Sequence, residues 1–314
     1  MAVSLQPAHT TRYGHEAALY RGAQGFLDAT VDFVRDGLAG AQPVLVAVVP
    51  DRIKLLREAL GDDADQVRFV DLAETGRNPA RIIPLWREFV DAHHGTPVRG
   101  IGEPVWAGRR SAELAEALLH EALLNLAFPD DPPLLLRCPY DADALGDAMV
   151  DEAHRRHPCV VAGGTRPGRG YHGPDAAAAE FAAPLPEVDA PVEAVDFRQL
   201  SGIRQLRALV AERAASLGIG PDRGLDLAMA VHEIAVNSLR HGGGHGTLRI
   251  WSDEASLVCE VRDGGHIREP LVGRVRPDPR QVSGRGVWLA NQLCDLVQIR
   301  SSAAGTQVRL HMAR

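Results

Sequence analysis

The chain has 314 residues, of which 45% are hydrophobic and 24% are charged, and its formal net charge is −7 at pH 7. This length allows two domains of ordinary size, each with its own buried core. The composition is that of a soluble globular protein, and no run of eighteen apolar residues is present, so no membrane-spanning segment is expected. The negative net charge argues against general, direct binding of nucleic acid.

The N-terminus and the cysteines point to the cytoplasm. The opening sequence MAVSLQPAHTTRYGHEA has no charged start followed by an apolar core, so no secretory signal is expected. The four cysteines are far apart and have no paired spacing, which predicts reduced, mostly buried thiols in a cytoplasmic protein. Lys54 is the only lysine and no glycine loop precedes it, so neither a Walker A loop nor Schiff-base chemistry is expected.

Strand-like and helical segments alternate from residue 15 to residue 162. Short apolar runs predict strands at 43–49, 67–72, 98–106 and 133–141. Helical periodicity predicts helices at 51–60 and 111–128, and Asn78 can cap a further helix that begins at Pro79. This alternation predicts a three-layer α/β domain with a mainly parallel sheet, which we assign to residues 1–162.

The remainder of the chain divides into a linker and a second domain. Residues 163–195 are rich in Gly, Pro and Ala without a sustained period, which predicts a partly extended linker. In residues 196–314, two amphipathic helices precede two alternating strands, a glycine-rich segment, a third helix and a final hairpin. We therefore expect helices on one face of a mixed or antiparallel sheet.

Residues 232–244, HEIAVNSLRHGGG, place a polar pair on the second of these helices. Glu233 and Asn237 are four residues apart, so their side chains lie on the same helix face. A carboxylate beside a carboxamide suits an acid/base group next to an oxygen ligand for a hard cation such as Mg²⁺. Taken alone, the same residues also fit an exposed polar pair followed by a glycine cap.

Two further segments combine glycine with a polar side chain. Asp263 ends a predicted strand and could accept a hydrogen bond from an exocyclic amine, although Asp-Gly is also common in turns. Gly284 and Gly286 precede a predicted helix, whose exposed N–H groups and dipole can hold phosphate oxygens. Arg285 between them can add a charge-assisted contact. A flexible loop that enters a helix would have the same sequence features.

The order of these elements resembles that of the Bergerat-fold ATPases, the family shared by gyrase, histidine kinases and the anti-sigma-factor serine kinases. The resemblance covers about residues 197–314 and implies an α/β sandwich of the histidine kinase-like ATPase type that binds ATP and Mg²⁺. It implies that Asn237 binds Mg²⁺ and that Glu233 is the general base. It also implies that Asp263 and Gly265 read adenine with Thr306 as a second contact, and that Gly284, Arg285 and Gly286 close over phosphate.

Two departures from the family pattern indicate which type of Bergerat-fold ATPase the domain resembles. Ile267 stands where the family often has a second glycine after Asp-x-Gly, and the segment 266–283 is short, as in the anti-sigma (RsbW-like) type. No helical hairpin with a phosphoacceptor histidine precedes the domain, and His232 lies inside the nucleotide helix. These features favour a protein serine kinase, or an anti-sigma switch without transfer, over a sensor histidine kinase.

The first domain resembles the MEDS sensory domain, a non-catalytic relative of RecA-like α/β folds. The resemblance rests on HEAALY (15–20), GRNPARIIP (76–84), GEPVW (102–106) and RCPYD (137–141). It implies sensing of a small organic ligand, with His15, Arg77 and Tyr140 lining a pocket at strand ends. Judged from the residues alone, Arg77, Asn78 and Tyr140 fit equally well as residues that only stabilise loops.

Several histidines invite a metal-site interpretation. His15, His120 and His232 each precede a glutamate, but the second histidine that HExxH requires is missing in all three places. His154 and His157 fall on one face of a predicted helix without a cysteine or carboxylate fixed by spacing. We therefore expect these two to be surface histidines.

Together the two resemblances predict a cytoplasmic, ligand-responsive regulator of transcription that acts by partner switching. Its ATPase domain would phosphorylate a serine on an anti-anti-sigma (STAS-type) protein, with a sigma factor as the alternative partner. One alternative is an anti-sigma binding switch without phosphotransfer. Another is a sensor histidine kinase-like protein whose acceptor lies on a second chain. The resemblance to dimeric anti-sigma kinases is compatible with a homodimer.

Overall fold

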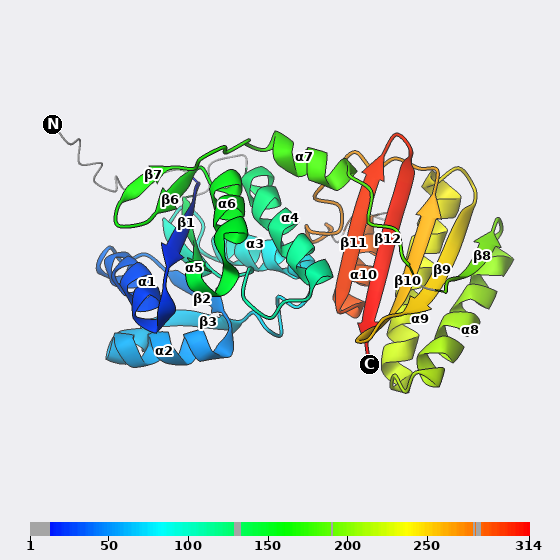
Figure 1. Ribbon diagram of the computed structural model, residues 1–314, viewed down its shortest axis with the longest axis horizontal. Coiled ribbons are helices and arrows are strands. Elements are labelled where there is room, and N and C mark those ends of the chain that lie inside the picture. Colours follow the sequence, from blue (N-terminus) through cyan, green and yellow to red (C-terminus); the bar gives the residue numbers. More distant parts are fainter. Residues whose placement is uncertain (1–12, 129–132, 190, 279, 281–283) are drawn as a thin grey trace. The chain divides into compact units, whose positions relative to one another are not determined.

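The computed structural model describes residues 13–128, 133–189, 191–278, 280 and 284–314. Contacts divide the chain into two compact units, Met1–Ala176 and Ala177–Arg314 (Figure 1). Parts of three ranges named above, 1–162, 163–195 and 266–283, lie outside the described residues.

The first unit is built on a seven-stranded sheet with the order β3-β2-β4-β5-β1-β6-β7. Every neighbouring pair is parallel except β6 and β7, which are antiparallel. The strands are β1 (Gly14–Tyr20), β2 (Val44–Val48), β3 (Val67–Asp71), β4 (Val98–Gly102), β5 (Leu134–Asp141), β6 (Cys159–Val161) and β7 (Thr165–Pro167).

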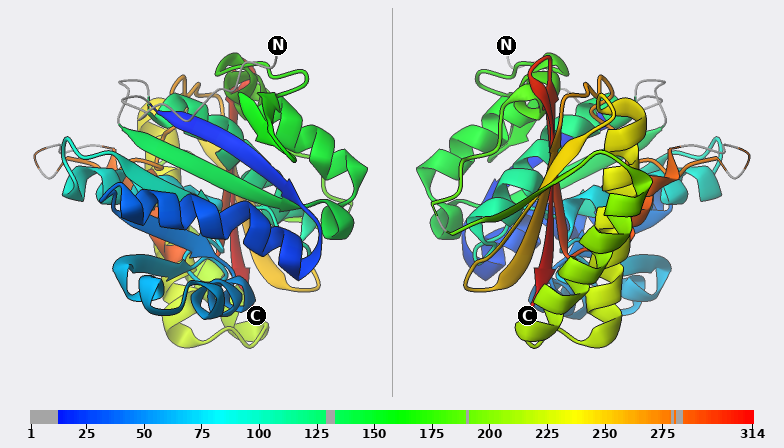
Figure 2. Two further views of the ribbon diagram at one scale, coloured as in Figure 1. Left: turned by 90° about the vertical axis from the view of Figure 1, so that its left-hand side faces the viewer. Right: turned by 90° about the vertical axis from the view of Figure 1, so that its right-hand side faces the viewer.

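Helices cover both faces of this sheet (Figures 1 and 2). They are α1 (Gly22–Ala39), α2 (Pro50–Leu60), α3 (Ile82–Ala92), α4 (Ser111–Ala127), α5 (Ala142–Leu145) and α6 (Asp147–Arg156), with 3₁₀ turns at Gly61–Gln66 and Pro79–Arg81. On one face, Arg137 of β5 donates a hydrogen bond to the Ala29 carbonyl in α1. On the other, a Cβ at Gly100 of β4 would lie 2.7 Å from the Trp86 ring of α3. The unit therefore has three layers.

Local sequence signals account for several of these elements. All five residues of β2 are buried, as expected for an inner parallel strand covered on both faces. Pro50 occupies the first turn of α2, where its missing N–H is not needed. The Asn78 side chain accepts a hydrogen bond from the Ala80 N–H, and the 3₁₀ turn that it caps leads directly into α3.

The second unit has a five-stranded sheet with the order β11-β12-β10-β9-β8, and all its neighbouring pairs are antiparallel. Its strands are β8 (Glu193–Phe197), β9 (Gly246–Ser252), β10 (Ser256–Asp263), β11 (Leu296–Ser302) and β12 (Gly305–Ala313). Its helices α8 (Leu200–Ser216), α9 (Pro221–His241) and α10 (Arg285–Leu293) pack on one face. Figure 2 shows α8 and α9 on the same side of the strands.

One core lies between this sheet and its helices. It includes Ile203, Leu206 and Val210 from α8, together with Leu257, Cys259 and Val261, the alternate residues of β10. The structure thus confirms a two-domain α/β protein, with a mixed sheet in the first unit and an antiparallel sheet with helices in the second.

The segment predicted to be a partly extended linker, residues 163–195, contains β7, α7 (Asp175–Ala182) and the start of β8. The four cysteines are free thiols, and three of them are buried. Within the described residues, no helix combines the length and the apolar character needed to cross a bilayer.

Candidate functional site

Helix α9 carries the Glu/Asn pair of the second unit. Val231, Ile234 and Ala235 point into the core, with at most 2% of each residue exposed. Glu233 and Asn237 are only partly buried and lie on the same helix face, one turn apart. The apolar residues therefore fix the helix against the sheet, and this orientation presents the carboxylate and the carboxamide together.

Asp263, the last residue of β10, is held by hydrogen bonds and by close packing. The Ser238 hydroxyl donates to Oδ2 at 2.6 Å, and the Gly265 N–H donates to Oδ1 at 2.8 Å. A Cβ on Gly242 would lie 2.4 Å from the Asp263 Cγ, and one on Gly305 would lie 2.5 Å from its carbonyl oxygen. Because glycine has no side chain, the backbone at Gly242 and Gly305 can pack closely around Asp263. This packing fixes the direction of the Asp263 carboxylate.

Thr306 lies directly opposite Asp263 in the β10–β12 pairing. Its hydroxyl donates a hydrogen bond to the Gly265 carbonyl at 2.9 Å and lies 2.7 Å from the Ser301 hydroxyl. Ser301 in turn accepts a hydrogen bond from the Ile267 N–H at 2.8 Å. This network joins the Gly265–Ile267 turn to the ends of β11 and β12.

The start of α10 packs against the polar face of α9. Gly284 is the N-cap of α10 and has a φ of 90°, which favours glycine. A Cβ on Gly286 would lie 2.8 Å from the Glu233 Oε2 and 3.2 Å from the Asn237 Nδ2. The absence of a side chain at Gly286 thus lets the helix start approach both groups, while Arg285 is exposed at the first turn.

These elements surround a cavity of about 210 Å³. Five residues selected from the sequence line it, namely Asn237, Asp263, Gly265, Gly284 and Thr306. Its apolar walls are formed by Ile234, Ile267, Val272, Val287 and Val308. Apolar walls suit a flat aromatic base, a fixed carboxylate suits an exocyclic amine, and a glycine-lined helix N-terminus suits phosphate. The chemistry of this lining is compatible with a bound nucleotide.

In the first unit, the three residues proposed for sensing do not all lie together. His15 and Tyr140 are both buried, and both of their rings lie near the ring of His157. The ring centroids of His15 and His157 are 4.1 Å apart, and those of Tyr140 and His157 are 5.6 Å apart. His15 is near the amino end of β1, whereas Tyr140 is near the carboxyl end of β5. Arg77 is exposed in the turn before α3.

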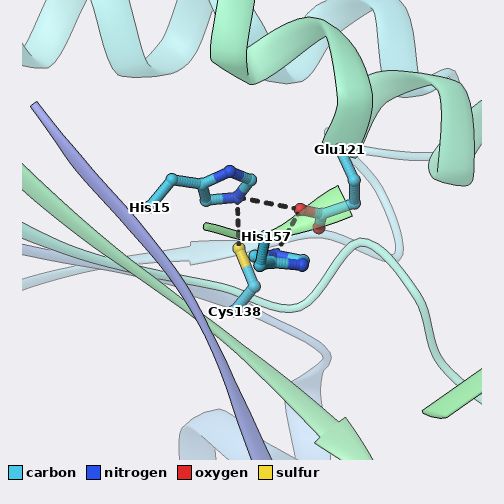
Figure 3. Close-up of side chains that lie close together, drawn as sticks. All are labelled: His15, Glu121, Cys138 and His157. Atoms are coloured by element: carbon cyan, nitrogen blue, oxygen red, sulfur yellow. Dashed lines mark hydrogen bonds and ion pairs between the residues drawn. The ribbon is translucent and has the colours of Figure 1, made fainter. Parts of the chain in front are cut away.

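Four side chains from separate elements form what we call the buried His/Glu/Cys cluster: His15, Glu121, Cys138 and His157 (Figure 3). The His15 Nε2 lies 3.0 Å from the Glu121 Oε2 and 3.4 Å from the Cys138 Sγ. The His157 Nε2 also lies 3.0 Å from the Glu121 Oε2. The prediction that His157 is a surface histidine is wrong, because it is fully buried at the end of α6.

Burial and the neighbouring charges together determine the pKa values of this cluster. Burial and the neighbouring His15 lower the pKa of His157. Burial alone would raise the pKa of Glu121, but His157 and His15 outweigh it and hold that pKa well below its ordinary value. Burial also raises the pKa of the Cys138 thiol, with a further contribution from Glu121.

A separate cavity of about 680 Å³ lies at the carboxyl end of β1. It is lined by Leu19, Tyr20, Arg21, Gly25, Asp28, Ala29, Ala142, Asp147, Val150, Val161, Ala162, Gly163 and Gly164, a set that does not include His15, Arg77 or Tyr140. The Tyr20 hydroxyl donates a hydrogen bond to the Glu103 Oε1 at 2.8 Å. Glu103 is 3% exposed, and this burial raises its pKa to about 7.

Comparison with protein-family models assigns both units. Residues 14–158 match MEDS, described as the methanogen/methylotroph, DcmR sensory domain, and residues 198–312 match the histidine kinase-like ATPase domain. The chain joins a MEDS domain to a histidine kinase-like ATPase domain. The MEDS domain is the first unit, and the ATPase domain, which holds the cavity beside Asp263, is the second.

No curated protein matches the chain. Among solved structures, the crystal structure of the RsbU and RsbW domains of Rv1364c from Mycobacterium tuberculosis matches with 19% identity and a TM-score of 0.30. The match covers 40% of this chain and 34% of that chain, so it spans about a third of that structure. A similarity this low does not indicate the function of this chain.

Neighbouring glycines beside Asp263 provide a test of the packing in the ATPase domain. A Cβ at Gly265 would lie 2.8 Å from the His241 carbonyl oxygen and 3.0 Å from the Gly242 Cα, whereas one at Gly264 would have nothing closer than 3.7 Å. Gly265→Ala is expected to destabilise the domain by about 1–3 kcal/mol through overpacking. Gly264→Ala is expected to stay within about 0.5 kcal/mol of the wild type. Urea denaturation measures both, and equal losses would contradict the described packing.

Glu103 should make the stability of the MEDS domain depend on pH. Its raised pKa means that folding favours the protonated carboxyl, so this contribution is complete below pH 4.5 and is lost as the pH rises to about 7. Glu103→Gln should therefore gain stability relative to the wild type across this window, by about 1–3 kcal/mol. Native-state hydrogen exchange measures the difference. The exposed Glu88→Gln serves as the control, and a difference that does not vary with pH would refute the assignment.

Proposed function

We propose that this protein is a ligand-responsive, partner-switching regulator whose ATPase domain binds Mg²⁺-ATP and phosphorylates a serine on an anti-anti-sigma (STAS-type) partner. The observation that carries this proposal is the convergence of three segments on one cavity. The polar face of α9, the Asp263 turn and the glycine-rich start of α10 meet there, in a domain of the histidine kinase-like ATPase type. A sigma factor is the alternative partner.

The base, the phosphates and the metal ion of the nucleotide each have a matching group in or beside the cavity. Asp263 keeps acceptor capacity on both oxygens beyond its bonds to Ser238 and Gly265, so it can accept from an exocyclic amine. The Thr306 hydroxyl lies beside it as a second polar contact. The N–H groups at the start of α10, with Arg285, would hold phosphate oxygens. The carboxamide oxygen of Asn237 would bind Mg²⁺.

We assign Glu233 the role of general base. It lies one helical turn before Asn237, and its carboxylate lies against Gly286 at the end of the site where phosphate would sit. From this position it can accept the proton of a serine hydroxyl that attacks the terminal phosphate. Phosphoryl transfer depends mainly on positioning and electrostatic stabilisation, so a fixed base beside a metal ligand is the arrangement that it requires.

We place the sensed organic ligand in the cavity at the carboxyl end of β1. Parallel α/β sheets bind ligands at this edge, and about 680 Å³ is within the range of roughly 300–1,000 Å³ usual for small-molecule pockets. Its lining combines apolar side chains such as Leu19 and Val150 with the charged residues Arg21, Asp28 and Asp147. This composition suits a small molecule with an apolar body and a polar group.

Nucleotide binding is tested by thermal unfolding with and without Mg²⁺-ATP. At about a hundred times its dissociation constant, a ligand stabilises its domain by roughly 2.7 kcal/mol. The wild type should show this shift, and Asp263→Asn should lose most of it, because an amide nitrogen turned toward the base would repel an exocyclic amine. Asp253→Asn, in the β9–β10 hairpin, is the matched control. No shift in the wild type at millimolar nucleotide would reject the nucleotide site.

Phosphotransfer is tested separately with Glu233→Gln. This variant should retain the Mg²⁺-ATP thermal shift but lose transfer to the partner serine by about 10²–10⁴-fold, the usual contribution of a general base. The measurement is incorporation of radioactive phosphate into the STAS-type partner, with the exposed Glu254→Gln as the control. Undiminished transfer by Glu233→Gln would show that Glu233 is not the general base. Acid-labile phosphate on a histidine would instead indicate a histidine kinase-like activity, and binding without transfer would indicate a binding switch.

A further inference from the structure

The buried His/Glu/Cys cluster lies in the MEDS domain, outside both cavities described above. His15 comes from β1, Glu121 from α4, Cys138 from β5 and His157 from the residue after α6. All four are at most 4% exposed, and their donor atoms lie within 4.8 Å of one another. In Figure 3 the two imidazoles, the carboxylate and the thiol point toward a common centre.

The hydrogen bonds of His15 determine which of its ring nitrogens carries a lone pair. Its Nδ1 lies 3.1 Å from the Asn125 Oδ1. The Asn125 Nδ2 donates to the carbonyls of Glu121, Ala122 and Arg156, so the amide oxygen must face His15 as an acceptor. The Nδ1 therefore carries the proton. In a neutral imidazole, the Nε2 is then left with a bare lone pair that points into the cluster.

His157 is held in the same tautomer. Its Nδ1 lies 2.8 Å from the Ala153 carbonyl oxygen, which can only accept, so this nitrogen also carries the proton. Its Nε2 makes no hydrogen bond of normal geometry, although it lies 3.0 Å from the Glu121 Oε2. When both rings are neutral, two lone pairs thus face the same carboxylate oxygen. These acceptors repel one another unless a positive charge, either a proton on one Nε2 or a metal ion, lies between them.

We propose that the buried His/Glu/Cys cluster binds one divalent transition-metal ion, of the zinc type, through the two Nε2 atoms, a Glu121 oxygen and the Cys138 thiolate. In a tetrahedral zinc site, neighbouring ligand atoms are about 3.3–3.8 Å apart, given Zn–N and Zn–S lengths of about 2.0 and 2.3 Å. Three of the six pairs of ligand atoms in the cluster are 3.0, 3.0 and 3.4 Å apart, close to this range, and all six pairs lie within 4.8 Å.

A metal ion would satisfy the charge balance of this cluster. Two neutral imidazoles, one carboxylate, one thiolate and a divalent cation sum to zero, which suits a site without access to water. Protonation of both histidines would instead place two like charges with ring centroids 4.1 Å apart beside a single carboxylate. Nitrogen, sulfur and carboxylate donors together are typical of zinc, and binding releases the Cys138 proton to solvent.

The surroundings of the ligands also match those of a metal centre. Metal-bound histidines usually donate the second ring N–H to a carbonyl or carboxylate, which fixes the ring and its tautomer. The Ala153 carbonyl and the Asn125 carboxamide fill this role for His157 and His15. Four protein ligands leave no open position for a substrate, so the ion would be structural and would join β1, α4, β5 and the end of α6.

The test uses the full-length protein, stripped with a chelator and titrated with Co²⁺, an optical probe for zinc sites. The expected result is one Co²⁺ per chain with a thiolate-to-cobalt charge-transfer band, displaced by one equivalent of Zn²⁺, and a raised unfolding temperature of the MEDS domain. Cys138→Ser should lose the charge-transfer band. Cys159→Ser, which removes a partly exposed thiol of β6 in the same domain, should keep it.

Three results would overturn the proposal. The first is a wild-type protein that is folded by circular dichroism yet gives neither a cobalt band nor a thermal shift with Zn²⁺. The second is a charge-transfer band that survives Cys138→Ser or disappears in Cys159→Ser. The third is metal bound with equal affinity after His157→Gln. If Cys138→Ser does not fold, the wild-type titration and the Cys159→Ser control still decide the matter.

Discussion

The ATPase domain depends on the close approach of backbone to Asp263. Three glycines, Gly242, Gly265 and Gly305, each leave room where a Cβ would come within 3 Å of this residue. Their packing brings the end of α9, the turn after β10 and the start of β12 to one point. Because the Ser238 hydroxyl and the Gly265 N–H then hold the carboxylate, its direction is fixed before any ligand arrives. Such preorganisation lowers the cost of ordering the site on binding.

The MEDS domain has a comparable centre of a different chemical kind. There, charged and polar groups, and not glycines, bring four elements together around Glu121. A buried carboxylate is costly unless its surroundings compensate it, so the identities of its neighbours are strongly constrained. The two domains therefore place their most constrained polar groups differently. In the ATPase domain these groups line a cavity, whereas in the MEDS domain they are enclosed within the core.

The sequence predicted features that depend on short spacings and missed those that depend on distant contacts. Glu233 and Asn237 are one helical turn apart, and Gly284 and Gly286 are two residues apart, so local spacing indicates their shared surfaces. His15 and Glu121 are 106 positions apart in the chain, and His15 and Cys138 are 123 apart. Only the pairing of β1 with β5 and the packing of α4 bring them together. The histidines in AHRRH resemble a surface helix end, and the burial of His157 follows from tertiary structure alone.

The position of β1 has a consequence for the order in which the MEDS domain can form. This strand is the first of those in the described residues, yet its hydrogen-bonding neighbours are β5 and β6, so both edges remain unpaired until residues beyond 134 are available. During synthesis the backbone N–H and C=O groups of this strand therefore have no strand partner until most of the domain has been made. Such non-local pairing slows folding and exposes strand edges to other chains. The sheet of this domain is thus completed only after its last strands, which end at Pro167, have been synthesised.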